Sequence, residues 1–384
     1  MMDLARSPQL QPADAHARYR ARRHFGSLDG LRFICISAVI WHHLPLWQTL
    51  DGPGTLLSRG QVGVDFFFVL SGYLITTLLL REEAANGQFS LRQFYWRRAL
   101  RILPIYLLVV GIAAGWSIGV QGHHDYLGKL PYYLLFLSNF LQGQIPFLDP
   151  TWSLAIEEQY YLIWPALLAL VPRRWIVALL LGLIAVNVLA AAGVFNRLGL
   201  APVYVGQLKL GLYGSTYAPI LMGSLAAVLL HGKAGYERIA PWVWPRPAPW
   251  LWFLALLALL GLYPSALEGF PNLAVHLLMT MVVMALVVRE DNGMRPLLTL
   301  RPIARIGQVS YGIYLYHLFA LAITGRAMAH LGIANWWLML ILYYALAVAM
   351  AEVSYRSLER YFLGLRYRAI RPERAGQEPH NPRQ

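Results

Sequence analysis

Ten stretches of 15–22 mostly apolar residues recur between about residues 33 and 355 of this chain. A helix needs about 20 such residues to cross the hydrocarbon core of a bilayer, so the recurrence predicts a polytopic helical membrane protein. The stretches lie at about residues 33–47, 62–80, 102–120, 152–171, 175–194, 215–230, 249–264, 273–288, 306–323 and 336–355. An alternative interpretation adds residues 130–142 as an eleventh. A transmembrane β-barrel is excluded because the stretches do not alternate apolar and polar residues.

Composition agrees with this class. The chain is 58% hydrophobic and 13% charged, whereas soluble domains carry about 25% charged residues. The single cysteine, Cys35, excludes an intramolecular disulfide. We predict an all-α fold with about ten transmembrane helices. It comprises a basic N-terminal segment (1–28), a transmembrane domain (29–360) and a basic, disordered tail (361–384).

The net charge of +13 marks topology rather than nucleic-acid binding. With the N-terminus in the cytoplasm, only five of the 32 Lys and Arg residues fall in outer segments. These five are Arg59, Lys129, Arg197, Lys209 and Arg326. By the positive-inside rule both termini are therefore predicted to be cytoplasmic. The basic stretch 15–25 is predicted to lie on anionic lipid.

Ionisable side chains occupy the outer parts of four predicted spans. These side chains are His42, His43, Asp65, Glu157, Glu158 and His317. Ionisable groups are costly in hydrocarbon, so their common depth predicts a shared polar cavity. A lone intramembrane histidine is equally often a hydrogen-bonded packing residue or an interfacial anchor, and a carboxylate near a helix mouth can simply extend outward to water. The prediction therefore rests on the common depth rather than on any one residue.

One face of the first predicted helix carries two basic groups. His43 follows Arg32 by eleven residues, which at 100° per residue returns to within about 20° of the same face. Their separation along the helix axis is roughly 16 Å. Arg32 and His43 are therefore predicted to line one wall of a passage. The adjacent histidine His42 points elsewhere, and the pair lacks metal-ligand spacing, so no metal site is predicted.

A second basic cluster lies on the predicted cytoplasmic side. Arg97, Arg98 and Arg101 stand together beside aromatic residues. Arg97 and Arg101 share a face if the segment is helical. Guanidinium groups match phosphate oxygens in bidentate geometry, so the cluster predicts phosphate recognition. Ordinary positive-inside charge explains one or two of these arginines equally well.

Five motifs in this order resemble acyltransferase family 3, the integral-membrane O-acyltransferases, over nearly all of residues 24–360. The motifs are LDGLR with Arg32-x10-His43, GVDFFFVLSGYLI (63–75), FYWRRALRILP (94–104), WSLAIEEQYYLIWP (152–165) and SYGIYLYH (310–317). The resemblance implies transfer of an acyl group, commonly acetyl, from acyl-CoA to a hydroxyl, usually on a carbohydrate. It also implies a multi-pass protein of the inner membrane, with acyl-CoA as co-substrate and no permanently bound cofactor. Some relatives carry an extracytoplasmic hydrolase-like domain, and the stand-alone form is expected here.

Residue roles follow from the matched motifs. The family's arginine and histidine of the first span correspond to Arg32 and His43, and its acidic motif corresponds to Glu157 and Glu158. Its arginine cluster corresponds to Arg97, Arg98 and Arg101. Ser71, Trp152 and His317, which lie in the matched motifs, are assigned to substrate or acyl-CoA binding.

The expected mechanism uses His43 as a general base toward the acceptor hydroxyl. A carboxylate orients the imidazole, with Glu157 as first choice and Asp65 as second. The alternative is a two-step route through an acyl-histidine.

Ionisable residues within membrane spans are also found in a different class of protein. A transporter or exporter of a glycan or small metabolite would place ionisable groups in several spans. No internal repeat is visible in the sequence, and the arginine cluster is of the phosphate-binding type, so the acyltransferase is preferred. A scaffold without catalysis is the third alternative. The sequence leaves open the identity of the acceptor and the length of the acyl group.

Overall fold

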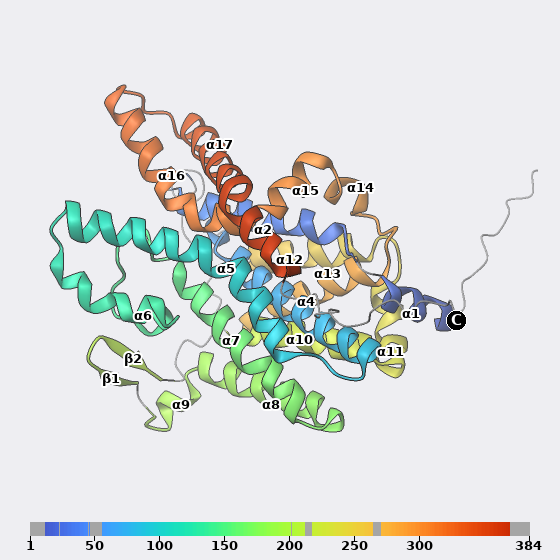
Figure 1. Ribbon diagram of the computed structural model, residues 1–384. Coiled ribbons are helices and arrows are strands. Elements are labelled where there is room, and N and C mark those ends of the chain that lie inside the picture. Colours follow the sequence, from blue (N-terminus) through green and yellow to red (C-terminus); the bar gives the residue numbers. More distant parts are fainter. Residues whose placement is uncertain are drawn as a thin grey trace, which may run out of the picture.

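The computed structural model describes residues 12–22, 24–44, 46, 56–200, 202–211, 217–263 and 270–368, which form an almost entirely helical body (Figure 1). The helices are α1 (Pro12–Ala21), α2 (Ser27–His43), α4 (Val62–Asn86), α5 (Leu91–Ala114), α6 (Leu130–Leu134), α7 (Thr151–Leu170), α8 (Arg173–Ala191), α9 (Val194–Arg197), α10 (Ala218–His231), α11 (Lys233–Val243), α12 (Ala248–Leu262), α13 (Phe270–Val288), α14 (Arg295–Leu298), α15 (Arg301–Gln308), α16 (Ser310–His330), α17 (Trp336–Ser354) and α18 (Arg360–Arg368). Two π-helical segments, Gly115–Val120 and Tyr355–Glu359, follow α5 and α17. The all-α prediction is confirmed for the described residues, apart from a small hairpin of β1 (Val203–Val205) and β2 (Leu208–Leu210).

Each of the ten predicted stretches contains a helix, but the predicted number of spans is not confirmed. Five described helical segments are long and apolar enough to cross a membrane, or up to seven if each of two bent pairs is one span. The five are α4, α5 with its π segment, α8, α13 and α17 through α18, and the bent pairs are α10–α11 and α15–α16. With 17 residues in α2 and 15 in α12, both helices are shorter than the about 20 residues of a full span.

The alternative eleventh span is not formed. The helical structure of residues 130–142 is limited to α6 and a 3₁₀ turn, Ser138–Phe140. Between them Phe136 has a φ of 53°, a left-handed conformation that ends a right-handed helix. This segment lies beside the β hairpin at the left edge of Figure 1.

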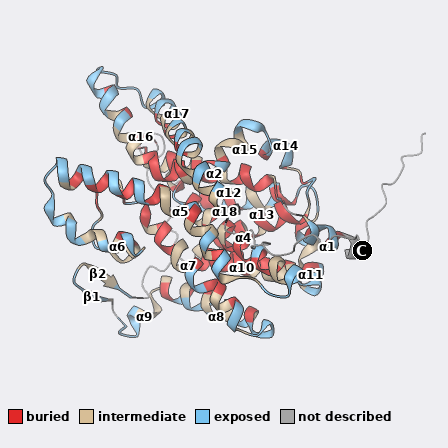
Figure 2. Cartoon of the chain, viewed as in Figure 1, coloured by how far each residue is buried: buried red, intermediate tan, exposed pale blue. Residues whose placement is uncertain are grey.

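Apolar side chains cover the outside of the helix bundle as well as its centre. Figure 2 shows buried residues concentrated in the middle of the molecule and exposed ones around its edge. On α8, Leu181 and Leu189 are exposed, and on α12 so are Leu251 and Leu254. Peripheral helices that expose large apolar residues need a non-aqueous surrounding, which is the pattern of a multi-pass membrane protein.

Helix α4 has a close backbone contact with α10. A Cβ atom at Gly72 would overlap with the carbonyl oxygen of Ile220, and one at Gly223 would overlap with that of Val69. Small residues permit such contacts between membrane helices. The interface is extended by buried hydrogen bonds of Tyr160 on α7, whose hydroxyl lies 2.7 Å from Ser224 Oγ. Helices α4, α7 and α10 are therefore held in one fixed arrangement.

The basic N-terminal stretch packs on protein as well as carrying charge. Tyr19 of α1 is buried, and its hydroxyl lies 2.9 Å from that of Tyr73 on α4. Arg81, near the end of α4, donates hydrogen bonds to the carbonyl oxygens of Tyr19 and Arg22. The N-terminal stretch is basic overall, but one face of α1 docks against α4. We did not predict this docking from the charge pattern.

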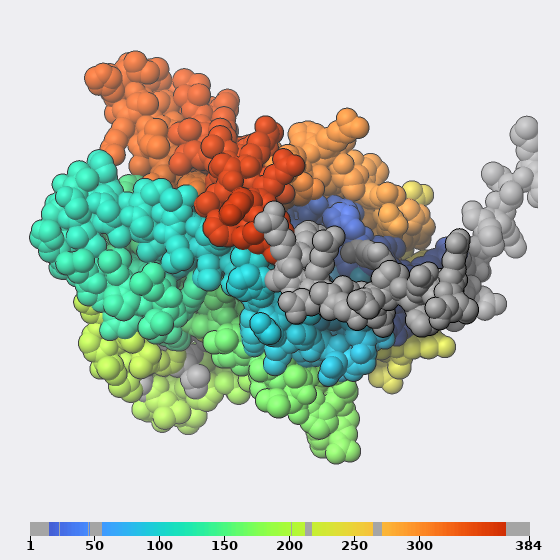
Figure 3. All heavy atoms as spheres, in the orientation of Figure 1, coloured from blue at the N-terminus to red at the C-terminus, as the bar shows by residue number. Residues whose placement is uncertain are grey.

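The predicted disordered tail begins as helix. Residues 361–368 continue the chain as α18, which contacts α5, and Figure 3 shows the red α18 region beside the cyan α5 region. Phe362, Leu363 and Leu365 are half-buried, so apolar contacts with the protein override the high charge of this segment. Residues 369–384 lie outside the described residues.

The α4–α10 contact predicts a sharp steric limit at Gly72. Gly72→Ala is expected to destabilise the protein by about 1–3 kcal/mol, because the added methyl group must displace the backbone of α10. The measurement is thermal unfolding of the purified protein in detergent. Gly182→Ala on α8 is the matched control, since nothing lies within 4 Å of a Cβ at that position. Equal stability of both variants would contradict the close contact.

Candidate functional site

A cavity of about 500 Å³ lies between α2, α4, α5, α7 and the α15–α16 junction. Helix α4 supplies a continuous stripe of lining residues at helical spacing: Val64, Phe67, Phe68, Ser71, Leu74, Leu78 and Glu82. From Val64 to Glu82 the helix rises about 27 Å at 1.5 Å per residue. This length approaches the about 30 Å thickness of a bilayer's hydrocarbon core. The cavity therefore runs along most of α4.

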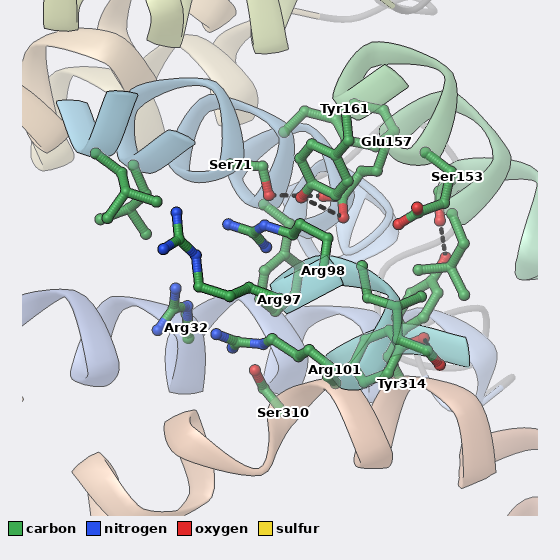
Figure 4. Close-up of a pocket in the computed structure, with 18 of the residues that line it drawn as sticks. Arg32, Ser71, Arg97, Arg98, Arg101, Ser153, Glu157, Tyr161, Ser310 and Tyr314 are labelled. Carbon is green, nitrogen blue, oxygen red and sulfur yellow. Dashed lines mark hydrogen bonds between the residues drawn. The ribbon is translucent and has the colours of Figure 1, made fainter. Parts of the chain in front are cut away.

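One end of the cavity, called the basic end here, is lined by Arg32, Arg97, Arg98 and Arg101. Figure 4 shows these guanidinium groups converging from two helices. They meet because α2 and α5 both begin at this end, so that residues of their early turns face each other. The arginines predicted from separate motifs are thus brought together.

The four arginines are engaged to different degrees. Arg97 forms a salt bridge of 2.8 Å with Glu82, whose other carboxylate oxygen accepts the backbone N–H of Ser90. Arg101 makes no hydrogen bond or ion pair with any residue in the described part of the chain. Arg97 therefore also joins α4 to α5, whereas the guanidinium of Arg101 has its donors available to a ligand.

Arg32 is held by a network at the start of α2. Its Nη1 lies 3.1 Å from Asp29 Oδ1, and Gln308 Nε2 donates to the other oxygen of Asp29 at 3.2 Å. Asp29 is buried, and its backbone is in close contact with Gly307. Arg32 therefore presents its charge to the cavity from a fixed position between α2 and α15.

Hydroxyl donors bind a carboxylate in the middle of the cavity. Ser71 Oγ donates to Glu157 Oε1 at 2.8 Å, and the Tyr161 hydroxyl donates to Glu157 Oε2 at 3.0 Å. Arg98 lies over the ring of Tyr161, 4.8 Å from its centroid, and attracts the carboxylates of Glu157 and the neighbouring Glu158. Two hydroxyl groups thus bind Glu157 (Figure 4), and Arg98 is the guanidinium that attracts both adjacent carboxylates.

The opposite end of the cavity is mainly apolar and aromatic. Ser153 and Tyr314 line it, with their hydroxyl oxygens 2.7 Å apart. The Tyr314 hydroxyl also donates to the carbonyl oxygen of Pro150 at 2.9 Å. The backbone of Tyr314 accepts a hydrogen bond from Nδ1 of His317 at 2.6 Å. We call this end the histidine end.

His43 and His317 lie together behind Tyr314. Their ring centroids are 4.6 Å apart, although the residues are 274 positions apart in the chain. Nδ1 of His43 lies 2.8 Å from the carbonyl oxygen of Val39. A carbonyl oxygen only accepts, so Nδ1 carries the proton and Nε2 of the neutral imidazole holds the free lone pair. His43 is therefore oriented with its basic nitrogen available.

The expected carboxylate partner of His43 is not found. Glu157 receives its hydrogen bonds from Ser71 and Tyr161. Asp65 lies 3.3 Å from Nε2 of His276 on α13. The backbone carbonyl of Val39 occupies the position at His43 Nδ1 that a carboxylate would need. Our prediction that Glu157 or Asp65 orients His43 is therefore corrected.

The predicted site residues divide into two groups. Lining the cavity are Arg32, Ser71, Arg97, Arg98, Arg101, Glu157 and Glu158. Outside its lining are His43 and His317, which adjoin it through Tyr314, Asp65, which pairs with His276, and Trp152, which packs edge-on against Phe68.

Some lining residues were missed although their motifs contained the signal. Tyr161 follows Glu157 by four residues, and Tyr314 precedes His317 by three, so helical spacing alone places each pair on one face. Glu82 gave no such signal, because its pairing with Arg97 depends on the α4–α5 turn. Within the described residues, no group of three or more His, Cys, Asp or Glu side chains is arranged to hold a metal ion.

Comparisons with known proteins show which proteins the chain is similar to. Residues 25–355 match a family model described as an acyltransferase domain. The chain is 30% identical over 373 residues to the peptidoglycan O-acetyltransferase OatA of Listeria monocytogenes, covering 88% of this chain and 56% of that protein.

Further relatives have related names. The putative peptidoglycan O-acetyltransferase YrhL of Bacillus subtilis is 28% identical over 363 residues, covering 88% of this chain and 55% of that protein. A putative O-acetyltransferase of Staphylococcus aureus is 37% identical over 164 residues, covering 39% of this chain and 26% of that protein. The chain spans about half the length of the first two relatives. No solved structure matches it.

The charge balance in the middle of the cavity predicts a stability effect. Arg98→Met is expected to lower the free energy of unfolding by about 1–3 kcal/mol, because two desolvated carboxylates lose their shared cation. Adding Glu158→Gln should recover part of the loss, since it removes one of these carboxylates. The measurement is the denaturation midpoint in detergent, with Arg92→Met at an exposed position of α5 as control. No recovery in the double variant would contradict the proposed compensation.

Proposed function

The chain belongs to the acyltransferase family defined by the match over residues 25–355, and we propose that it is a membrane O-acyltransferase. Its donor is acyl-CoA, with acetyl as the transferred group. Its acceptor is a hydroxyl of a carbohydrate or glycoconjugate. The names of two relatives, a peptidoglycan O-acetyltransferase and a putative one, support an acetyl group and a cell-wall glycan.

The observation that carries the proposal is the course of the cavity. It leads from a group of guanidinium side chains at the basic end to Tyr314 at the other, and His317 and His43 adjoin that end behind Tyr314. Acyl-CoA has the same polarity, since its phosphates and its thioester lie at opposite ends of a long flexible arm. A donor bound along α4 would present its thioester at Tyr314, next to the histidines behind it, while its phosphates stay on the arginines.

The charge pattern supports an orientation. Only five of the 32 Lys and Arg residues fall in segments assigned to the outer side, so the basic end faces the cytoplasm under the positive-inside rule. The donor enters from the cytoplasm, and the acceptor meets it at the histidine end on the outer side. In this arrangement the acyl group crosses most of the bilayer within the protein, in the inner membrane of the cell.

Residues at the basic end and in the middle hold the donor. Arg101, with its guanidinium donors available, and Arg98 bind the diphosphate in bidentate geometry. Arg32 adds positive charge from a fixed position. In the middle, the oxygens of Glu157 accept hydrogen bonds from the amide groups of the pantetheine arm. Glu157 therefore acts on the donor arm rather than on His43.

His43 supplies the proton transfer. Its Nε2 removes the proton of the acceptor hydroxyl as the oxygen attacks the thioester carbonyl carbon. A C–O bond forms, the C–S bond breaks, and coenzyme A leaves as a thiolate that takes up the proton. His43 is the last residue of α2, and the negative end of the helix dipole stabilises the imidazolium formed in between. The packed ring of His317 fixes the ring of His43 from one side.

One assay tests the reaction class. Purified protein is incubated with acetyl-labelled acetyl-CoA and a soluble fragment of peptidoglycan, and the products are analysed by mass spectrometry. We expect an ester-linked acetyl group on the glycan and free coenzyme A. A transporter would leave both compounds chemically unchanged, and that result would contradict the proposal.

The two adjacent histidines predict opposite outcomes. His43→Ala is expected to lower kcat by about 10²–10⁴-fold, the usual contribution of a general base. His42→Ala should retain most activity, since the ring of His42 is nearly perpendicular to that of His43, at 85°, and takes no part in the proposed mechanism. Transfer rates of both variants, normalised to folded protein, decide the point. An inactive His42→Ala beside an active His43→Ala would contradict the assignment.

The basic end predicts a change in donor affinity without a change in chemistry. Arg101→Ala is expected to raise the KM for acetyl-CoA by roughly tenfold to a hundredfold, the equivalent of one lost charged hydrogen bond. Arg92→Ala, an exposed arginine on the same helix that does not line the cavity, is the control and should leave KM unchanged. Equal KM values for Arg101→Ala and the wild type would contradict donor binding at this end.

A further inference from the structure

A second cavity, of about 420 Å³, lies beside the basic end of the first. It is formed by the end of α1, the start of α2 and the last turns of α4. Arg32, Leu74 and Leu78 line both cavities, so the two cavities adjoin at these side chains. The volume is within the range of small-molecule sites, about 300–1,000 Å³.

Positive charge dominates this second cavity. Arg20, Arg22, Arg32 and Arg81 line it, against the single carboxylate of Asp29. Arg81 donates to two backbone carbonyl oxygens, and Arg22 donates to the carbonyl oxygen of Val287 at 2.8 Å. Hydrogen bonds to neutral carbonyl groups fix both guanidinium groups. Arg22 also pairs with Glu290 at 3.8 Å, whereas Arg81 pairs with no carboxylate in the described residues and keeps its full charge. The cavity therefore keeps a positive potential that an anion can use.

Arg20 differs from the other arginines of this cavity. It is exposed, and it makes no hydrogen bond or ion pair with a residue in the described ranges. Phe25, Leu28 and the shared Leu74 and Leu78 supply an apolar wall next to it. The cavity thus combines an available guanidinium with an apolar and aromatic surface, which is the combination that a phosphorylated nucleoside requires.

We propose that the second cavity binds the 3′-phosphoadenosine end of acyl-CoA, with Arg20 on the 3′-phosphate. This inference rests on the proposed function and names a subsite of the same donor. Coenzyme A carries two separate anionic groups on one ribose, a 5′-diphosphate and a 3′-phosphate. Two adjoining basic cavities that share Arg32 match this pair, with the diphosphate on Arg98 and Arg101 and the nucleoside against Phe25. The 3′-phosphate has a charge close to −2 at neutral pH, so its loss should weaken donor binding strongly.

The test compares two donors that differ only in that phosphate. Transfer from acetyl-CoA and from 3′-dephospho-acetyl-CoA is measured with protein in phosphatidylcholine nanodiscs. The wild type should show a KM at least about tenfold higher for the dephospho donor. Arg20→Ala should raise the KM for acetyl-CoA by about tenfold and leave that for the dephospho donor unchanged. Arg20→Lys should restore part of the difference, and Arg18→Ala, exposed on the same helix, should behave as wild type.

Each alternative outcome is distinguishable. Equal KM values of the wild type for the two donors would overturn the inference while leaving the acyltransferase intact. An equal loss with both donors in Arg20→Ala would overturn it too, because the effect would then not depend on the 3′-phosphate. Adding phosphatidylglycerol would assign the cavity to a lipid headgroup if it raised the KM in the wild type but not in Arg20→Ala. No transfer from either donor would instead remove the proposed function itself.

Discussion

The backbone contact between α4 and α10 determines where every other element of the site can lie. Gly72 and Gly223 let the two helices approach until side chains larger than hydrogen no longer fit. This contact uses one face of α4, on which Val69 and Tyr73 also lie. The stripe from Val64 through Ser71 to Glu82 points away from it, and α2, α5 and α7 surround that stripe instead of filling it. The cavity exists because one face of α4 packs tightly against α10, whereas the helices around its other face leave a space beside it.

Most charged groups in the interior of this cavity are tolerated because they meet a complementary group. Arg98 faces carboxylates, Arg32 is bound to Asp29, and Glu157 accepts two hydroxyl donors. An unpaired charge in a low-dielectric interior would be costly. The positive charges that remain without a carboxylate are concentrated at the basic end. The charges in the interior of the cavity are therefore balanced, whereas the basic end is cationic. This distribution favours a ligand with an anionic head group and a neutral arm.

The sequence was sufficient for the parts of the molecule that follow from local periodicity. Apolar length placed a helix in each of ten stretches, and helical spacing put Arg32 and His43 on one helix. The arginine cluster and Glu157 were found because their motifs are short and continuous. Contacts between distant segments could not be derived in this way. The pairing of Asp65 with His276, the edge-to-face contact of His43 with His317 and the docking of Tyr19 on Tyr73 depend on helix packing. We did not predict that the partner of His43 Nδ1 is the carbonyl oxygen of Val39 rather than a carboxylate. Every residue has a backbone carbonyl, so the sequence does not single this one out.

The hydrogen bonds from Arg81 to the carbonyl oxygens of Tyr19 and Arg22 have a thermodynamic consequence. They tie α1 to the same helix whose other residues line the first cavity, so the docked position of α1 and the shape of the basic end are linked. Linkage is reciprocal: a ligand that prefers the docked arrangement also raises the free energy needed to detach α1. The N-terminal helix thus reports on occupancy at a distance from the reacting atoms, and its rate of amide hydrogen exchange would change with the concentration of ligand.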